Sequence, residues 1–249
     1  MKKMAIQKQK SKGKVKQNST QSIQQVLETA FLAGDMDTIQ GKPYLVYDIE
    51  TQMTTGDMLK QKFMMAYVID SIDKKYRYVN FETLPKFVDY MLKFDGYIIG
   101  YNQIWFDNPV CVHNIGGDES ITEQLNAKSI DVMVFLQNMI GRRMKLTKVA
   151  ESLISTGKTL DSGLEAQQLY EEYEKTGLKS LLEKVKRYCK NDVKMTLLVF
   201  LYVMYYKELH HDDTTSSYTT TDIIEKSQKV IKRNDTEQQH TKNDSLFAG

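Results

Sequence analysis

The sequence predicts an α/β fold in which a mixed five-stranded sheet is flanked by helices. The main observation is the order of segments, which runs three strands, a helix, a strand, a helix, a short strand and then helices. This order is typical of a sheet with helices packed on its faces. The second observation is that 41% of the 249 residues are hydrophobic. That content fits one sizeable core better than two small domains.

The first elements follow from the spacing of apolar residues. Residues 23–33 place Val26, Leu27, Ala30 and Phe31 at helical spacing. Short links with Gly, Asp or Lys then separate runs rich in β-branched and aromatic residues, as in a β-meander. The three strands expected from these runs are residues 44–50, 63–69 and 76–81.

The later elements are predicted in the same way. Thr83-Leu84-Pro85 is a helix start, and the amphipathic pattern continues through Lys93. Residues 96–101 form a fourth buried strand and residues 129–133 a short fifth one. The rest of the chain to Tyr206 is predicted helical, ending in a long helix from about residue 178.

Polar segments flank this domain at both ends. Residues 1–22 contain seven Lys and no acid, without hydrophobic periodicity, and are predicted to be disordered. They are either a solubilising tail or a basic arm that attracts phosphates. Residues 210–249 are predicted to be a polar, mostly disordered tail with one short helix near residues 223–231. The folded domain is therefore expected at residues 23–209.

Composition excludes several classes of protein. Two cysteines, Cys111 and Cys189, are too few for a disulfide scaffold or a four-cysteine zinc site, and suit a reducing compartment. The longest strongly apolar run, residues 197–206, is too short to span a membrane. No apolar segment follows the N-terminal lysines as in a signal peptide. We expect a soluble cytoplasmic protein without a membrane partner.

Two carboxylates stand near the end of the first strand. Asp48 and Glu50, in the run YLVYDIET, are two residues apart and share one face of the strand. Paired carboxylate oxygens suit Mg²⁺ or Mn²⁺. About one D-x-E pair arises by chance in a chain of this composition, so an exposed strand end is the alternative interpretation.

A third acid follows the fourth strand in the run IIGYNQIWFDNPV. Asp107 comes directly after Trp105 and Phe106, and two residues before Pro109. It is either a metal-facing carboxylate or the N-cap of a helix that begins at the proline. The aromatic residues are accounted for equally by packing in the core.

The long helix carries the last motif, in the run VKRYCKNDVKMT. Tyr188 and Asp192 are four residues apart, so they lie on one face of the helix about one turn from each other. A phenol and a carboxylate placed in this way can hold one water between them and a metal. About one Y-x-x-x-D pair is also expected by chance.

The three motifs occur in order within residues 43–206, and together they resemble the DnaQ-like 3′–5′ exonucleases of the DEDD superfamily, in the subgroup with tyrosine in the third motif. The turn GYNQIWFDNP and the YCKND helix are similar to YprB-like exonucleases and to proofreading domains of family B DNA polymerases. The segment KLTKVAESLISTGKTLDSGLEA is closer to the YprB-like group. The resemblance implies a ribonuclease H-like fold.

The resemblance also implies a mechanism, in which two divalent ions, Mg²⁺ or Mn²⁺, hydrolyse the terminal phosphodiester and release nucleoside monophosphates. Asp48 would bridge both ions, Glu50 and Asp192 would hold the ion beside the nucleophile, and Asp107 would support the ion beside the leaving group. Tyr188 would orient the attacking water.

The resemblance places the 3′ ends of single-stranded DNA, or of RNA, at this site. Its substrate-binding residues would be Asn102, Phe106, Thr51 and Lys158, although a solvated surface position also accounts for Lys158. A different class of function is a non-catalytic nucleic-acid-binding or scaffold subunit that retains the fold. The complete set of four acids with Tyr188 argues against it, and no polymerase or other protein partner is predicted.

Overall fold

The computed structural model describes residues 22–53, 61–155, 163–211 and 214–228. The centre of the fold is one mixed sheet with strand order β4-β3-β2-β5-β6. Strands β2, β3 and β4 form an antiparallel meander, and β5 and β6 run parallel to β2. The strands are β2 (Lys42–Gln52), β3 (Lys62–Asp70), β4 (Tyr76–Asn80), β5 (Tyr97–Gly100) and β6 (Ser129–Asp131). All five strands expected from the sequence are confirmed.

One further strand was not expected. The two-residue β1 (Thr38–Ile39) pairs with the start of β2 and makes the sheet six-stranded. A pattern of alternating residues cannot be recognised in two residues, so this strand has no sequence signal of its own.

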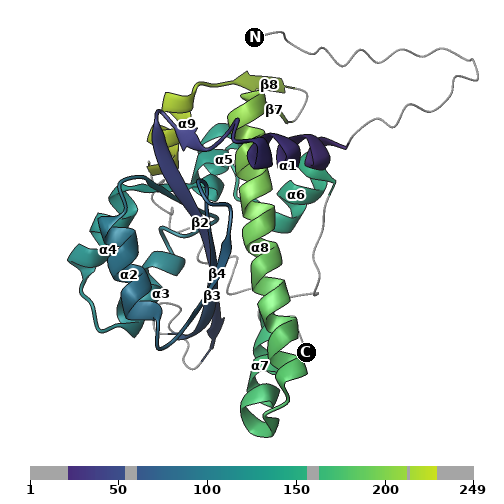
Figure 1. Ribbon diagram of the computed structural model, residues 1–249. Coiled ribbons are helices and arrows are strands. Elements are labelled where there is room, and N and C mark those ends of the chain that lie inside the picture. The colour runs from purple at the N-terminus through teal and green to yellow at the C-terminus, as the bar shows by residue number, and fades with distance from the viewer. Residues whose placement is uncertain (1–21, 54–60, 156–162, 212–213, 229–249) are drawn as a thin grey trace, which may run out of the picture.

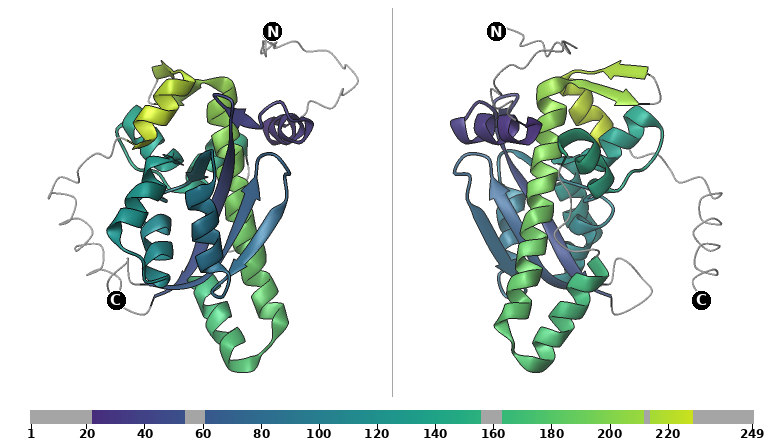
Figure 2. Two further views of the ribbon diagram at one scale, coloured as in Figure 1. Left: turned by 60° about the vertical axis from the view of Figure 1, so that its left-hand side comes forward. Right: turned by 90° about the vertical axis from the view of Figure 1, so that its right-hand side faces the viewer.

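Helices cover both faces of the sheet (Figure 1). One face carries α2, α3 and α4, and the other carries α1, α5, α6 and the long α8, with α7 packed against α8. The long α8 lies against β2, β3 and β5, and its lower part extends with α7 beyond the sheet (Figure 2). The bounds are α1 (Ile23–Ala33), α2 (Leu84–Lys93), α3 (Asp107–Asn114), α4 (Glu119–Ala127), α5 (Val132–Ile140), α6 (Leu146–Ile154), α7 (Gly163–Thr176), α8 (Lys179–Tyr206) and α9 (Thr220–Gln228).

The side chains of β2 point alternately to the two faces of the sheet and so contribute to both sides of the core. Leu45, Tyr47 and Ile49 are buried against the layer of α2, α3 and α4. Val46 faces the opposite layer, which contains α8. Because side chains alternate along a strand, Asp48 and Glu50 continue the row of Val46 and face α8.

The C-terminal segment differs from the polar tail expected from residue 210. A hairpin of β7 (Glu208–His211) and β8 (Thr214–Ser217) precedes α9. Tyr218 and Ile223 are buried in the same core cluster as α8, and the Tyr218 ring packs edge-on against Phe135 with centroids 4.9 Å apart. A few large apolar side chains are therefore enough to hold residues 214–228 on the domain, although their neighbours are polar.

No helix in the described parts of the chain combines the length and the apolar character that crossing a membrane requires. The prediction for residues 1–22 falls, apart from Ser22, outside the described residues. Lys158 also lies outside them.

Candidate active site

The carboxylates of β2 meet one turn of α8. Asp48 and Glu50 lie on the strand, and the thiol of Cys189 donates a hydrogen bond to the backbone oxygen of Asp48, with sulfur and oxygen 3.5 Å apart. Of the residues that the structure describes, Asp48, Glu50 and Cys189 are the group of three potential metal ligands whose ligand atoms all lie within 4.8 Å of one another. The contact from Cys189 fixes the depth at which its neighbours on α8 approach the strand.

Tyr188 and Asp192 complete this cluster from α8. Burial raises the pKa of the Tyr188 phenol, and the charges of Asp192, Glu50 and Asp48 raise it further. Tyr188 also forms a side-chain hydrogen bond with Asp192. The phenol therefore stays protonated at neutral pH and acts as a hydrogen-bond donor among three carboxylates. The structure thus brings together Asp48, Glu50, Tyr188 and Asp192.

Asp107 reaches the same strand from the opposite layer. Its side chain is 4% exposed, and Oδ1 accepts a hydrogen bond of 3.2 Å from the backbone N–H of Ile49, the residue between Asp48 and Glu50. Burial, and then the charge of Asp131, raise the pKa of Asp107 to about 7. The alternative role of Asp107 as a helix N-cap is wrong, because Phe106 is the N-cap residue and Asp107 is the first residue of α3.

Asp131 is an acid that the sequence analysis did not select. It is fully buried at the start of α5, where Oδ1 accepts hydrogen bonds from the backbone N–H groups of Asn102 (2.9 Å), Met133 (3.0 Å) and Val134 (3.2 Å). Its Oδ2 accepts from the N–H of Ile104 at 3.1 Å. Burial raises the pKa of Asp131 to about 6 against the opposing effect of these bonds. One carboxylate therefore caps α5 and holds the turn that leads to Asp107.

That turn presents Asn102 to a cavity beside the acids. The backbone of Asn102 has a φ of +71°, in the left-handed region, and its Oδ1 accepts a 2.7 Å hydrogen bond from the guanidinium of Arg143. Asn102, Arg143, Lys145 and Asp192 all line a cavity of about 420 Å³. Asn102 thus shares this cavity with a carboxylate of the acid cluster, and Arg143 is a second polar residue there that sequence reasoning missed.

The remaining predicted substrate residues are placed differently. Thr51 bonds through its hydroxyl to the side chain of Gln61, and Phe106 is partly buried against the layer of α2 and α3. Neither lines the cavity that Asn102 shares with Asp192. Trp105 is 42% exposed, so it is not a core residue, although packing in the core was one of the two interpretations of it.

The donor set suits a hard divalent cation. Asp48 and Glu50 offer carboxylate oxygens from one strand, Asp192 offers another from α8, and Asp107 contacts the backbone N–H of the residue between Asp48 and Glu50. Such oxygen ligands favour Mg²⁺ or Mn²⁺ over softer metals. Carboxylates gathered in one place repel each other, and a bound cation relieves this repulsion.

A family model described as the RNase_H superfamily matches residues 45–204 of the chain. The chain belongs to this superfamily. The matched range begins on β2, ends within α8 and therefore contains every described residue of the candidate site. The fold expected from the motifs is confirmed. Among curated proteins, none matches this chain.

Two solved structures are similar to this chain. The family B DNA polymerase of the hyperthermophilic archaeon Pyrobaculum calidifontis superposes with a TM-score of 0.50 at 18% identity, over 64% of this RNase_H superfamily protein and 24% of the polymerase. RNase D of Trypanosoma brucei superposes with a TM-score of 0.49 at 14% identity, over 73% of this chain and 62% of that one. The chain therefore spans about a quarter of the length of the polymerase.

Proposed function

We propose that this protein is a metal-dependent 3′–5′ exonuclease that removes nucleoside monophosphates from the ends of single-stranded nucleic acid. Membership of the RNase_H superfamily supports a nuclease in general. One observation carries the finer proposal: α8 brings Tyr188 and Asp192 to the face of β2 that holds Asp48 and Glu50. This cluster contains the residue types that hydrolysis of a phosphodiester needs in one place.

Each side chain has a defined task in this proposal. Asp48, Glu50 and Asp192 would hold two divalent cations, with Asp107, which contacts the backbone of β2 between Asp48 and Glu50, supporting them. When bound, such cations activate water and neutralise the charge that develops on the phosphate oxygens. Tyr188 is kept protonated by its surroundings, so it would donate its hydroxyl proton in a hydrogen bond that orients the attacking water.

The cavity next to Asp192 would receive the end of the strand. Asn102 and Arg143 are hydrogen-bonded to each other there, and a guanidinium is well suited to bind a phosphate through two N–H groups. We propose single-stranded DNA as the substrate and RNA as the alternative polymer. A site that reads the 2′-hydroxyl would separate the two.

The test uses 5′-labelled single-stranded DNA and RNA of the same sequence, incubated with Mg²⁺, Mn²⁺ or EDTA. We expect a metal-dependent ladder that shortens from the 3′ end, and its absence in Asp48→Ala. Glu123→Ala, which removes an exposed acid of α4, is the matched control and should cleave normally. A folded wild-type protein that binds either polymer without cleaving it would instead identify a non-catalytic binding subunit.

A further inference from the structure

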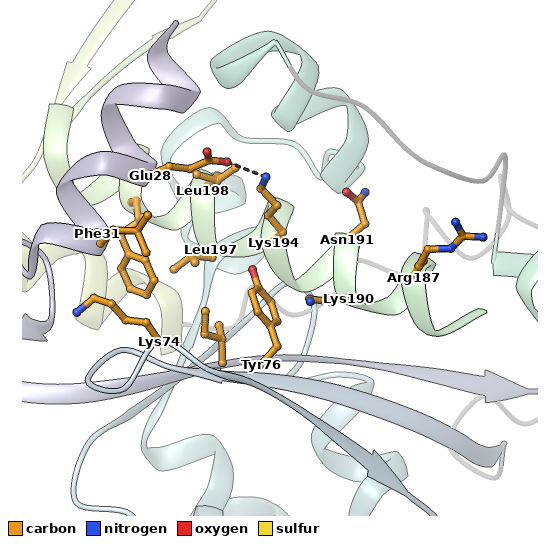
Figure 3. Close-up of a pocket in the computed structure, with 13 residues that line it drawn as sticks. Glu28, Phe31, Lys74, Tyr76, Arg187, Lys190, Asn191, Lys194, Leu197 and Leu198 are labelled. Carbon is orange, nitrogen blue, oxygen red and sulfur yellow. Dashed lines mark ion pairs between the residues drawn. The ribbon is translucent and has the colours of Figure 1, made fainter. Parts of the chain in front are cut away.

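A second cavity lies between α1, α8 and the turn that joins β3 to β4. Its volume is about 500 Å³, within the range of small-molecule sites. The floor is apolar and includes Phe31, Ile69 and Leu197. Figure 3 shows the side chains that line this cavity.

Two cations at the rim are available to an anion. Arg187 and Lys190 project from α8 and are exposed, and within the described residues neither forms an ion pair with an acid. Lys190 Nζ lies 4.7 Å from the centre of the Tyr76 ring, which holds the ammonium group at the edge of the cavity. The other lysines at the rim are compensated, since Lys194 pairs with Glu28 at 2.7 Å and Lys74 with Asp37.

The same cavity offers flat apolar surfaces. Phe31 and Tyr76 stand on either side of its floor (Figure 3). Burial, with the charge of Glu28, raises the pKa of Tyr76 to about 12, so this ring stays neutral. A neutral aromatic ring can stack against the flat ring of a ligand.

We propose that this cavity binds a nucleotide, with the base on the apolar floor between Phe31 and Tyr76. Arg187 and Lys190 would bind the phosphate. A flat ring and a phosphate in one molecule match the apolar floor and the two cations at the rim. The proposal does not rest on the exonuclease function.

The cavity is separate from the acid cluster. Lys190 and Asn191 line it, whereas their neighbours on α8, Tyr188 and Asp192, belong to the cluster on β2. Successive residues of a helix point about 100° apart, so one turn of α8 serves both places. Substitutions of the α8 residues that line the cavity should therefore affect a ligand bound there, and substitutions in the acid cluster should not.

The experiment is isothermal titration calorimetry of the full chain with AMP in EDTA, so that binding through metal ions at the acid cluster is prevented. We expect Lys190→Met and Arg187→Met each to weaken AMP binding about tenfold, the cost of losing one charge-assisted hydrogen bond. Both residues are exposed, so the variants should fold. Lys179→Met, an exposed lysine at the start of α8 away from the cavity, and Asp48→Ala should bind as the wild type does.

Ligand fragments complete the test. Adenosine and inorganic phosphate should each bind much more weakly than AMP, because each satisfies only part of the cavity. The proposal is overturned if AMP does not bind at about 10 mM, or if binding is lost in Asp48→Ala and unchanged in Lys190→Met. Decanoate that binds more tightly than AMP would also overturn it, since the cavity would then select an aliphatic anion.

Discussion

Replacing Asp131 tests whether one buried carboxylate organises the candidate site. Its two oxygens accept four backbone N–H bonds, two from the turn that carries Asn102 and two from the first turn of α5. In Asp131→Ala all four buried donors lose their acceptor, at about 1 kcal/mol each. Burial of the charged group, which raises the pKa of Asp131 to about 6, is relieved in alanine and offsets part of this loss. We therefore expect a loss of about 2–4 kcal/mol in the free energy of unfolding.

Asp131→Asn is the matched variant. Its Oδ1 can retain the three bonds to Asn102, Met133 and Val134, while its Nδ2 meets the N–H of Ile104. We expect a loss of about 1–2 kcal/mol, from one missing bond and one donor facing another. Urea denaturation in EDTA measures both variants. A loss below about 1 kcal/mol for alanine, or equal losses for the two variants, would refute the view that Asp131 holds the turn.

Three further predictions concern the site directly. Tyr188→Phe should lower the turnover number of strand cleavage by about 10²-fold or more while a denaturation midpoint changes little, because the buried ring is kept and only the hydroxyl, with its bond to Asp192, is lost. Unchanged turnover would remove Tyr188 from the mechanism. Arg143→Ala should raise KM for the nucleic-acid strand with kcat retained, and should reduce the slope of log binding affinity against log salt concentration by about one. Arg142→Ala is the control and should change neither quantity. In EDTA, the free energy of unfolding should fall as pH rises from about 4 to 8. The folded pKa values of Asp107 (about 7) and Asp131 (about 6) exceed the ordinary 3.8, so the folded state holds protons that the unfolded state has released. The fall should be about 1.4 kcal/mol per pH unit where one of these two carboxyls is protonated in the folded state and ionised in the unfolded state. Mn²⁺ should restore more stability at pH 8 than at pH 5, and a stability that rises with pH in EDTA would contradict the assigned burial.

The fold was predictable because its long elements carry strong periodic patterns. The five main strands, and helices α1, α2 and α8, lie close to where the spacing of apolar residues placed them. The short helix expected near residues 223–231 lies close to α9, but its packing onto the domain depends on a few distant contacts and was not predictable. Residues 214–228 read as polar, and only the tertiary structure shows that Tyr218 donates to the backbone oxygen of Val203 and packs on Phe135.

In the candidate site too, some residues were predictable from local spacing and others depend on distant contacts. Asp48, Glu50, Tyr188 and Asp192 were selected because their spacing on a strand and on a helix already places them in pairs. Asp131 fell inside the strand expected at residues 129–133, and its role as an N-cap follows only from the helix that begins at Val132. Its two bonds to the turn at residues 102–104 come from a segment 27–29 residues away, and no local pattern contains them. Arg143 is selected only by its contact with Asn102.

The register of β2 explains why these pairs meet. A shift of one residue would turn Asp48 and Glu50 toward the apolar layer of α2 and α3 and expose Tyr47 and Ile49 to α8. Two contacts oppose that shift from both sides of the strand: the bond from Ile49 N–H to Asp107, and the bond from Cys189 to the backbone oxygen of Asp48. The irregular pairing between Glu50 and Thr51 comes only after both acids have been presented. Asp107 is therefore a residue that aligns the strand as well as a candidate ligand, so its substitution should disturb the positions of Asp48 and Glu50 even without metal.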